Sequence, residues 1–385
     1  MMRRALMLSA ALLASPSVRA DDDVAPYRDG ADAKPTLAEE DRVWAEGEEG
    51  EKGLVKSGHV HADPALSAYL QEVMDRLYPE FAGKIRVRVA NDSGLNAFAL
   101  PQGAIFFNMG LLARLENEAQ MATILAHEGA HFTHRHAFKS VRSAKGLSGF
   151  ALTAGLLAGG GGAILGSLAA ISSMSGFSQD AEREADRLGF ERMVRAGYDA
   201  RESVKGFQLL ADEVEALGIE EPFFFASHPR LRQRIESFEA LIAGYTGPAG
   251  EAGEARFSAL THGLREQWLQ AQIGEGKPKS VIHVLSNPAM LGRYPAHAAY
   301  YLGEAYRQRG EEGDAEKALA AWRRAVEQAP EFAPSYRALG VQAMKQREWL
   351  PAQTNLKRYL ALAPQARDTA YVHAYLANIE ERLKP

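Results

Sequence analysis

The segment His127-Glu128-Gly129-Ala130-His131 places two imidazoles four residues apart, with a carboxylate directly after the first. Side chains four residues apart lie on the same face of a helix, so both imidazoles can bind one tetrahedral metal ion. Glu128 lies beside that face, where it can deprotonate a water activated by the metal. The pattern predicts half of a zinc-hydrolase site, and the alternative is a polar helix surface with incidental histidines.

The residues before this segment carry the signals of a helix start. Asn117 can cap the helix, and Gln120 stands where a capping box places its second member. An apolar stripe comes next, formed by Met121, Ile124 and Leu125. We therefore expect the two histidines on a well-formed helix.

A third ligand is expected from the amphipathic segment 182–186. Glu182 and Asp186 share one helix face, so Glu182 can reach the metal while Asp186 fixes the tautomer of a ligating histidine. Glu184 is expected to point elsewhere, into solvent. A third histidine after the first two is excluded because Phe138 occupies the position that it would need. The predicted ligand set is therefore His, His, Glu and water.

With this ligand set the chain resembles the zinc metallopeptidases typified by HtpX and the CaaX prenyl proteases. It is most similar to their periplasmic BepA-like (YfgC-like) branch, which carries C-terminal tetratricopeptide repeats. The resemblance covers roughly residues 60–240 in the expected order, and Gln179 and the turn 100–103 depart from the family pattern without removing a ligand. The matching segments are 96–100, 104–107, 127–131, 135–136, 182–186, 196–199, 227–229 and Arg234.

The resemblance implies an α+β chain that is mostly α. Its parts are a gluzincin-like metallopeptidase domain with a small β-sheet, followed by a tetratricopeptide-like α-helical repeat domain. One Zn²⁺ per chain is implied, bound by His127, His131 and Glu182, with Asp186 behind the ligands. The runs 85–89 and 104–107 suit a small antiparallel sheet whose edge aligns a peptide substrate, or which serves only as core.

The resemblance also implies that His228, which precedes a proline, stands close to the metal. His228 can stabilise the oxyanion of the tetrahedral intermediate, with Arg234 as an electrostatic helper. Alternatively, it can occupy the fourth zinc position and gate a latent enzyme, or simply cap the helix that begins near Pro229. His134 and His136 are expected in supporting or surface positions rather than as ligands.

Residues 1–20 have the pattern of a secretory signal peptide, with Arg3 and Arg4 before an apolar stretch and Val18-Arg19-Ala20 at its end. Removing its three arginines changes the formal charge from −5 to −8, an acidic balance that excludes a general nucleic-acid partner. The chain has no cysteine, so neither a disulfide nor a lipid-modified N-terminus is available. We expect an exported protein of the bacterial periplasm.

Residues 246–256 are small, flexible and acidic, which is typical of a linker between a metallopeptidase domain (21–245) and a repeat domain (257–385). In the second domain, segments 326–330 and 360–364 recur with a 34-residue offset, the period of tetratricopeptide helix pairs. Such arrays present a concave face to a protein partner. The alternative is a lid that only stabilises the protease.

Residues 146–179 contain no charged residue and are long enough to enter a bilayer. The glycine run 159–162 divides them into two segments that are each short for a membrane span. We therefore expect two helices near the active site that touch the membrane surface, with a spanning hairpin as the alternative.

Together these features predict an exported zinc-dependent endopeptidase that degrades misfolded or misassembled envelope and outer-membrane proteins. The repeats are expected to recruit these unfolded substrates or to dock on the outer-membrane assembly machinery. The alternative, from a different class, is a periplasmic chaperone or assembly scaffold with a latent metal site.

Overall fold

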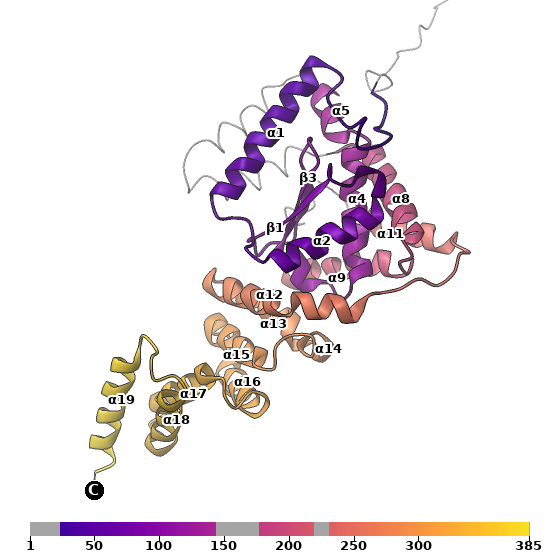
Figure 1. Ribbon diagram of the computed structural model, residues 1–385. Helices are drawn as coiled ribbons and strands as arrows, with labels where there is room; N and C mark the ends of the chain where they lie inside the picture. Colours follow the sequence, from indigo (N-terminus) through magenta and orange to yellow (C-terminus); the bar gives the residue numbers. More distant parts are fainter. Residues whose placement is uncertain (1–23, 144–176, 219–230, 385) are drawn as a thin grey trace, which may run out of the picture.

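The computed structural model describes residues 24–143, 177–218 and 231–384. The predicted signal peptide, most of the uncharged stretch 146–179 and His228 lie outside the described residues. Helices dominate the described part, and its strands form one small sheet, which confirms the mostly α architecture (Figure 1). None of the described helices is both long and apolar enough to cross a membrane.

The helix that carries the two histidines, α4 (Glu118–Thr133), lies at the centre of the N-terminal part (Figure 1). Asn117 caps it by accepting a hydrogen bond from the backbone N–H of Gln120 at 3.0 Å. The Gln120 side chain accepts from the N–H of Glu116 at 2.9 Å, so the expected capping box is displaced by one residue. All 16 residues of α4 are buried, so the helix is enclosed on every side rather than along one stripe.

The sheet differs from the antiparallel pair predicted from the sequence. β1 (Arg86–Ala90) pairs in parallel with β3 (Ala104–Asn108), and β2 (Ala97–Ala99) pairs with β3 in antiparallel fashion, giving the order β1-β3-β2. The prediction was wrong because it missed β2: the chain reverses twice between β1 and β3, so both point the same way. The second reversal uses Gly103, whose φ of +88° favours glycine.

Helices cover both faces of this sheet (Figure 1). Phe107 of β3 faces the main hydrophobic core, which also includes residues of α2 (Pro64–Leu77) and α4. Its neighbour Phe106 faces the other way and packs with Leu54 of α1 (Ala38–Lys56). This alternation along β3 places the sheet between α1 on one side and α2 with α4 on the other.

Among the remaining helices of the N-terminal part, α8 (Gln179–Arg195), α9 (Glu202–Leu217) and α11 (Leu231–Ala243) form one packed group with α4. α8 makes the most extensive contact with α4, and α9 and α11 pack beside these two. The others are η1 (Pro79–Phe81), α3 (Met109–Arg114) and α5 (His136–Ser143).

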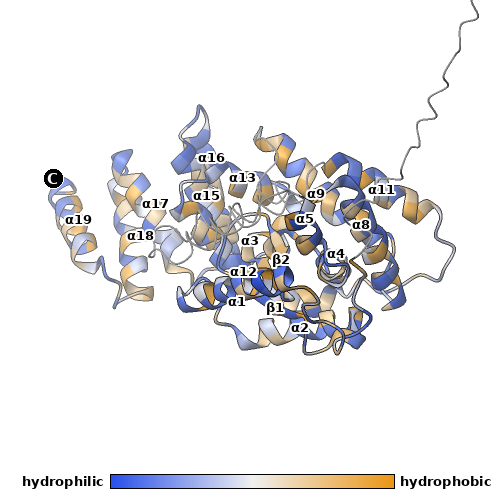
Figure 2. Ribbon diagram, turned by 90° about the horizontal axis from the view of Figure 1, so that it is seen from above, coloured by the Kyte–Doolittle hydropathy of each residue, from blue (hydrophilic) through white to orange (hydrophobic). Residues whose placement is uncertain are grey.

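Beyond residue 253 the chain is helical, as the sequence predicted. α15 begins at Ala298 and α17 at Ala333, 35 residues later, so two similar helical hairpins follow one another. Figure 2 shows these helices in a row that extends away from the N-terminal part. The helices are α12 (Glu254–Gly274), α13 (Pro278–Ser286), α14 (Pro288–Leu291), α15 (Ala298–Arg309), α16 (Asp314–Gln328), α17 (Ala333–Lys345), α18 (Trp349–Leu362) and α19 (Thr369–Arg382).

The first of these helices, α12, is joined firmly to the N-terminal part. Its Trp268 is fully buried in the main core, and the guanidinium of Arg114 lies 3.6 Å from the centre of the indole ring. Arg265 donates a hydrogen bond to the carbonyl of Leu115 at 3.1 Å. The main core continues through α15, whereas α17, α18 and α19 share a separate hydrophobic cluster.

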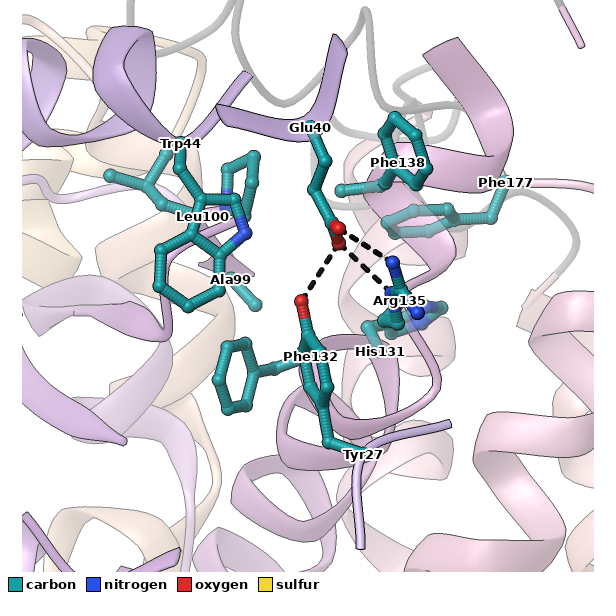
Figure 3. A pocket seen from close by; sticks show the side chains of 12 residues that line it. Tyr27, Glu40, Trp44, Ala99, Leu100, His131, Phe132, Arg135, Phe138 and Phe177 are labelled. Atoms are coloured by element: carbon teal, nitrogen blue, oxygen red, sulfur yellow. Dashed lines mark hydrogen bonds and ion pairs between the residues drawn. The ribbon is translucent and has the colours of Figure 1, made fainter. Parts of the chain in front are cut away.

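A buried ionic cluster ties the N-terminal segment to the end of α4 (Figure 3). The carboxylate of Glu40 on α1 is fully buried and accepts hydrogen bonds from the Tyr27 hydroxyl at 2.8 Å and from Arg135 Nε at 2.9 Å. Arg135 lies just beyond α4 and has a φ of +59°, a conformation that residues other than glycine adopt rarely. The cluster therefore stabilises an otherwise unfavourable turn.

Replacing Glu40 tests this cluster. We expect Glu40→Ala to lower the free energy of unfolding by about 3–5 kcal/mol, because it leaves the Arg135 guanidinium buried without its carboxylate. Glu49→Ala on the same helix is the matched control, since Glu49 is 73% exposed and forms an exposed ion pair with Lys52. Urea unfolding followed by circular dichroism measures both variants, and equal stability of the two would contradict the argument.

Candidate metal centre

Three buried side chains from two helices converge at the centre of the N-terminal part. α4 supplies His127 and His131, α8 supplies Glu182, and one ligand atom of each lies within 4.8 Å of the others. The two Nε2 atoms are 2.9 Å apart, and Glu182 lies 3.6 Å from His127 Nε2 and 3.4 Å from His131 Nε2. The structure thus brings together the three residues predicted as metal ligands.

This donor set fits a small divalent metal ion. A tetrahedral ion about 2.1 Å from each donor requires the donors to be roughly 3.4 Å apart, close to the separations between His127, His131 and Glu182. Two imidazoles and one carboxylate with room for a further ligand are typical of catalytic zinc sites. Imidazole also suits other divalent transition metals, so the donors identify a metal site rather than one metal.

The approach of α8 to α4 requires a glycine. A Cβ atom added at Gly189 would lie 3.0 Å from the backbone N and 3.2 Å from the Cα of His127. Any larger residue would push α8 away and withdraw Glu182 from the two histidines. Sequence reasoning missed Gly189, although an isolated glycine inside a strong helical pattern signals a close approach of this kind.

His127 is held from behind by two buried charged residues. Its Nδ1 lies 2.9 Å from Asp186 Oδ1, which fits the predicted role of Asp186 in fixing the histidine tautomer. Arg234 of α11 donates from Nη2 to the same Asp186 oxygen at 2.7 Å, and its Nη2 is also 3.0 Å from His127 Nδ1. Burial lowers the pKa of Arg234, but Asp186 and Glu182 outweigh this effect and raise the pKa above its ordinary value.

The placement of Arg234 bears on its predicted role. Its guanidinium is paired with Asp186 behind His127 and lies 4.3 Å from the centre of the Phe207 ring. A guanidinium held there orients the carboxylate that contacts His127, and this favours a positioning role over direct contact with an oxyanion. His228, the proposed partner of Arg234, lies outside the described residues.

The neighbours of His131 differ from those of His127. The ring of Phe177 stacks on it with centroids 3.9 Å apart, and His136 Nδ1 lies 2.9 Å from His131 Nδ1. The second ring nitrogen of His136 lies 3.1 Å from Glu184 Oε2, a contact that the sequence did not predict for this half-exposed carboxylate. Burial lowers the pKa of His136 to about 4, so this imidazole is neutral at pH 7. The prediction missed the contact because it treated each helix face separately.

Glu128, predicted as the proton acceptor, is fully buried next to His127 on α4. A cleft of about 430 Å³ between α8 and α11 opens beside Glu182 and Asp186. The cleft therefore reaches one of the three predicted ligands, Glu182, and the Asp186–Arg234 pair that lies behind His127.

Gly129, between the two histidines predicted as ligands, is also required by packing. A Cβ atom added there would lie 2.4 Å from the ring of Tyr78, whose hydroxyl donates to the carbonyl of Ala126 at 2.5 Å. The Tyr78 ring therefore fills the space that any side chain at residue 129 would need. This contact links the segment before the sheet to the turn of α4 that bears the ligands.

This packing predicts opposite effects for two glycine substitutions. Gly129→Ala is expected to lower the free energy of unfolding by about 1–3 kcal/mol, because the added methyl group overpacks the Tyr78 contact. Gly263→Ala in α12, where no atom lies within 4 Å, is the matched control and should raise it by about 0.5–1 kcal/mol. Urea unfolding curves measure both, and stabilisation by Gly129→Ala would contradict the packing argument.

Comparison with known proteins agrees with this geometry. Residues 63–242 match peptidase family M48. The beta-barrel assembly-enhancing protease of Escherichia coli is 30% identical over 187 residues, which cover 45% of this chain and 38% of that protein. The protein of the same name from Yersinia pestis is 28% identical with the same coverage.

The chain is also similar to a mitochondrial protein. The mitochondrial metalloendopeptidase OMA1 of Saccharomyces cerevisiae is 31% identical over 166 residues, covering 40% of this chain and 46% of that protein. The chain thus matches less than half of the length of each of these relatives. Residues 63–242, just under half of the chain, thus resemble the peptidases of family M48, and they hold all three predicted metal ligands.

Proposed function

We propose that this protein is an exported zinc-dependent endopeptidase that degrades misfolded or misassembled envelope and outer-membrane proteins. The observation that carries the proposal is the buried convergence of His127, His131 and Glu182 within an M48 peptidase domain. Glu128 lies on the same turn of α4 as the first ligand, where a general base for hydrolysis is needed.

The residues of the site have separate tasks in hydrolysis. His127, His131 and Glu182 would hold a zinc ion, which would supply Lewis-acid activation of water and of the peptide carbonyl. Glu128 accepts a proton from the attacking water and then passes one to the leaving amine. Asp186 and Arg234 keep His127 in the tautomer that presents Nε2 to the ligand site. His228 remains the candidate for oxyanion stabilisation or for a gating fourth ligand.

The sheet supports a substrate that binds as an extended strand. The outer side of β1 is occupied, because His61 donates its backbone N–H to the carbonyl of Val89 at 2.8 Å. The other edge strand, β2, packs against α4 and has no ladder partner on its outer side among the described residues. A peptide aligned on β2 by main-chain hydrogen bonds would lie beside the ligands and tolerate many sequences.

The rest of the proposal concerns the parts of the chain outside the M48 match. We propose that residues 1–20 direct export to the periplasm, that 21–245 form the peptidase domain and that 246–256 link it to repeats in 257–385. Two relatives are named as proteases that enhance beta-barrel assembly. The successive hairpins of α15–α18 support a role for the repeats in recruiting substrates or docking on assembly machinery.

Glu128 provides the direct test of catalysis. We expect Glu128→Gln to retain zinc but to reduce casein cleavage by about 10²–10⁴-fold, because the general base is lost while the ligands remain. Zinc content and cleavage are measured on purified mature protein, with Glu215→Gln on the exposed side of α9 as control. His228→Ala is assayed in parallel, and higher activity would identify His228 as a gate.

The outcomes separate the proposal from its alternative. Cleavage by the wild type that is lost in Glu128→Gln supports the peptidase. Bound zinc without cleavage by the wild type or by His228→Ala supports a chaperone or assembly scaffold with a latent metal site. Retention of the cellular function by Glu128→Gln would support the same alternative.

Metal removal tests the ligands independently of activity. Zinc at 100 times its dissociation constant should stabilise the folded wild type by about 2.7 kcal/mol, because the unfolded chain lacks the site. Chelation should therefore lower the melting temperature of the wild type and leave that of His127→Ala unchanged. Differential scanning calorimetry measures both, and a chelator-sensitive His127→Ala would argue against these ligands.

A further inference from the structure

The most informative contact outside the assigned ligands is the one between two imidazoles. His131 Nδ1 lies 2.9 Å from His136 Nδ1, and the two rings meet at 74° with centroids 5.0 Å apart. His136 is only 3% exposed, so water has little access to this contact. On its far side, His136 Nε2 lies 3.1 Å from Glu184 Oε2 at the edge of the protein.

Only one arrangement of protons is consistent with metal binding through His131 Nε2. A ligating Nε2 carries no proton, so the proton of the neutral His131 ring lies on Nδ1 and must be donated. The acceptor at 2.9 Å is His136 Nδ1, which must then be free of a proton. A neutral His136 carries its single proton on Nε2, and that atom faces the Glu184 carboxylate.

We propose that His136 and Glu184 are positioning residues that hold His131 in the tautomer and orientation required for metal binding. The inference rests on the proposed metal site. Glu184 accepts from His136 Nε2–H, which leaves His136 Nδ1 as an acceptor for His131 Nδ1–H. Hydrogen bonds of this kind fix the ring of a ligating histidine and raise its basicity.

The fold places His136 for this task through the turn at Arg135. The left-handed conformation of Arg135 ends α4 and starts α5 at His136, one turn beyond the second ligand. The carboxylate of Glu40 holds Arg135 in that turn, and Figure 3 shows Glu40, Arg135 and His131 close together. Phe177 stacks on the face of His131 and limits its tilt.

Helix α8 therefore supports the two ligating histidines in two different ways. On α8, Asp186 contacts His127 directly, whereas Glu184 reaches His131 only through His136. The Asp186 side chain is 2% exposed and that of Glu184 is 40% exposed. Water can therefore take over part of the role of Glu184, whereas it cannot reach the buried position of His136. Substitutions of His136 should accordingly weaken zinc binding more than substitutions of Glu184.

The test compares two residues of similar size at position 136. Asn resembles the near half of the imidazole and keeps an acceptor for His131 Nδ1–H, whereas Leu has no acceptor. We expect His136→Leu to weaken zinc binding by about 10–100-fold and His136→Asn to stay within about threefold of wild type. Competition with a chromophoric chelator measures the zinc dissociation constant, and unfolding of the metal-free proteins checks that both variants fold.

Glu184→Ala provides a second measurement, at a half-exposed position where a substitution should leave the fold intact. It should weaken zinc binding by less than about tenfold, and Glu184→Gln, which keeps an acceptor oxygen, should restore wild-type affinity. Glu191→Gln, in an exposed pair with Arg187 on the same helix, is the control and should leave the zinc affinity unchanged. Nitrogen-15 spectra of the zinc-loaded wild type should show His136 with its proton on Nε2.

The outcomes distinguish this inference from the proposed function. A wild-type protein that binds no zinc overturns the metal site itself. Wild-type zinc affinity in both His136→Leu and Glu184→Ala, or a His136 proton found on Nδ1, overturns the positioning role while leaving the metal site intact. If His136→Leu fails to fold, the comparison of Glu184→Ala with Glu184→Gln decides.

Discussion

The site depends on the close crossing of α4 and α8. Gly189 allows the backbone of α8 to approach His127 so closely that no side chain fits between the helices. This crossing brings Glu182 to both histidines and places Asp186 behind the first of them. One constraint on main-chain distance thus sets the geometry of the ligands and of their supporting carboxylates. The surrounding helices and sheet hold the two helices in that position.

Burial gives this arrangement its rigidity and its energetic cost. His127, Glu128 and His131 lie on a helix without an exposed residue, where polar groups without partners destabilise the fold by several kcal/mol. Partners from distant segments offset that cost: Asp186 with Arg234 on one side and His136 with Glu184 on the other. Ligand geometry and fold stability are therefore coupled, because the same hydrogen bonds serve both.

Prediction from the sequence succeeded for features set by spacing within one helix and failed where separate segments meet. The four-residue spacing of His127 and His131 and the shared face of Glu182 and Asp186 are fixed by helical geometry alone, so the structure brings these residues together as expected. The sheet pairing was wrong because the short strand β2 carries too little pattern to reveal a second reversal. The contact of Glu184 was missed because its partner His136 comes from another helix.

The contacts that complete the site join residues far apart in the sequence, and this determines the stage of folding at which the site can form. Glu40 lies 95 residues before Arg135, and Arg234 lies 107 residues after His127. Contacts across such long stretches form late, after the loops between them have closed. The ligand set is therefore complete only after α8 has docked on α4, and the support behind His127 only after α11 has docked as well. A chain that has not yet folded this far lacks the arrangement of ligands that the proposed hydrolysis requires.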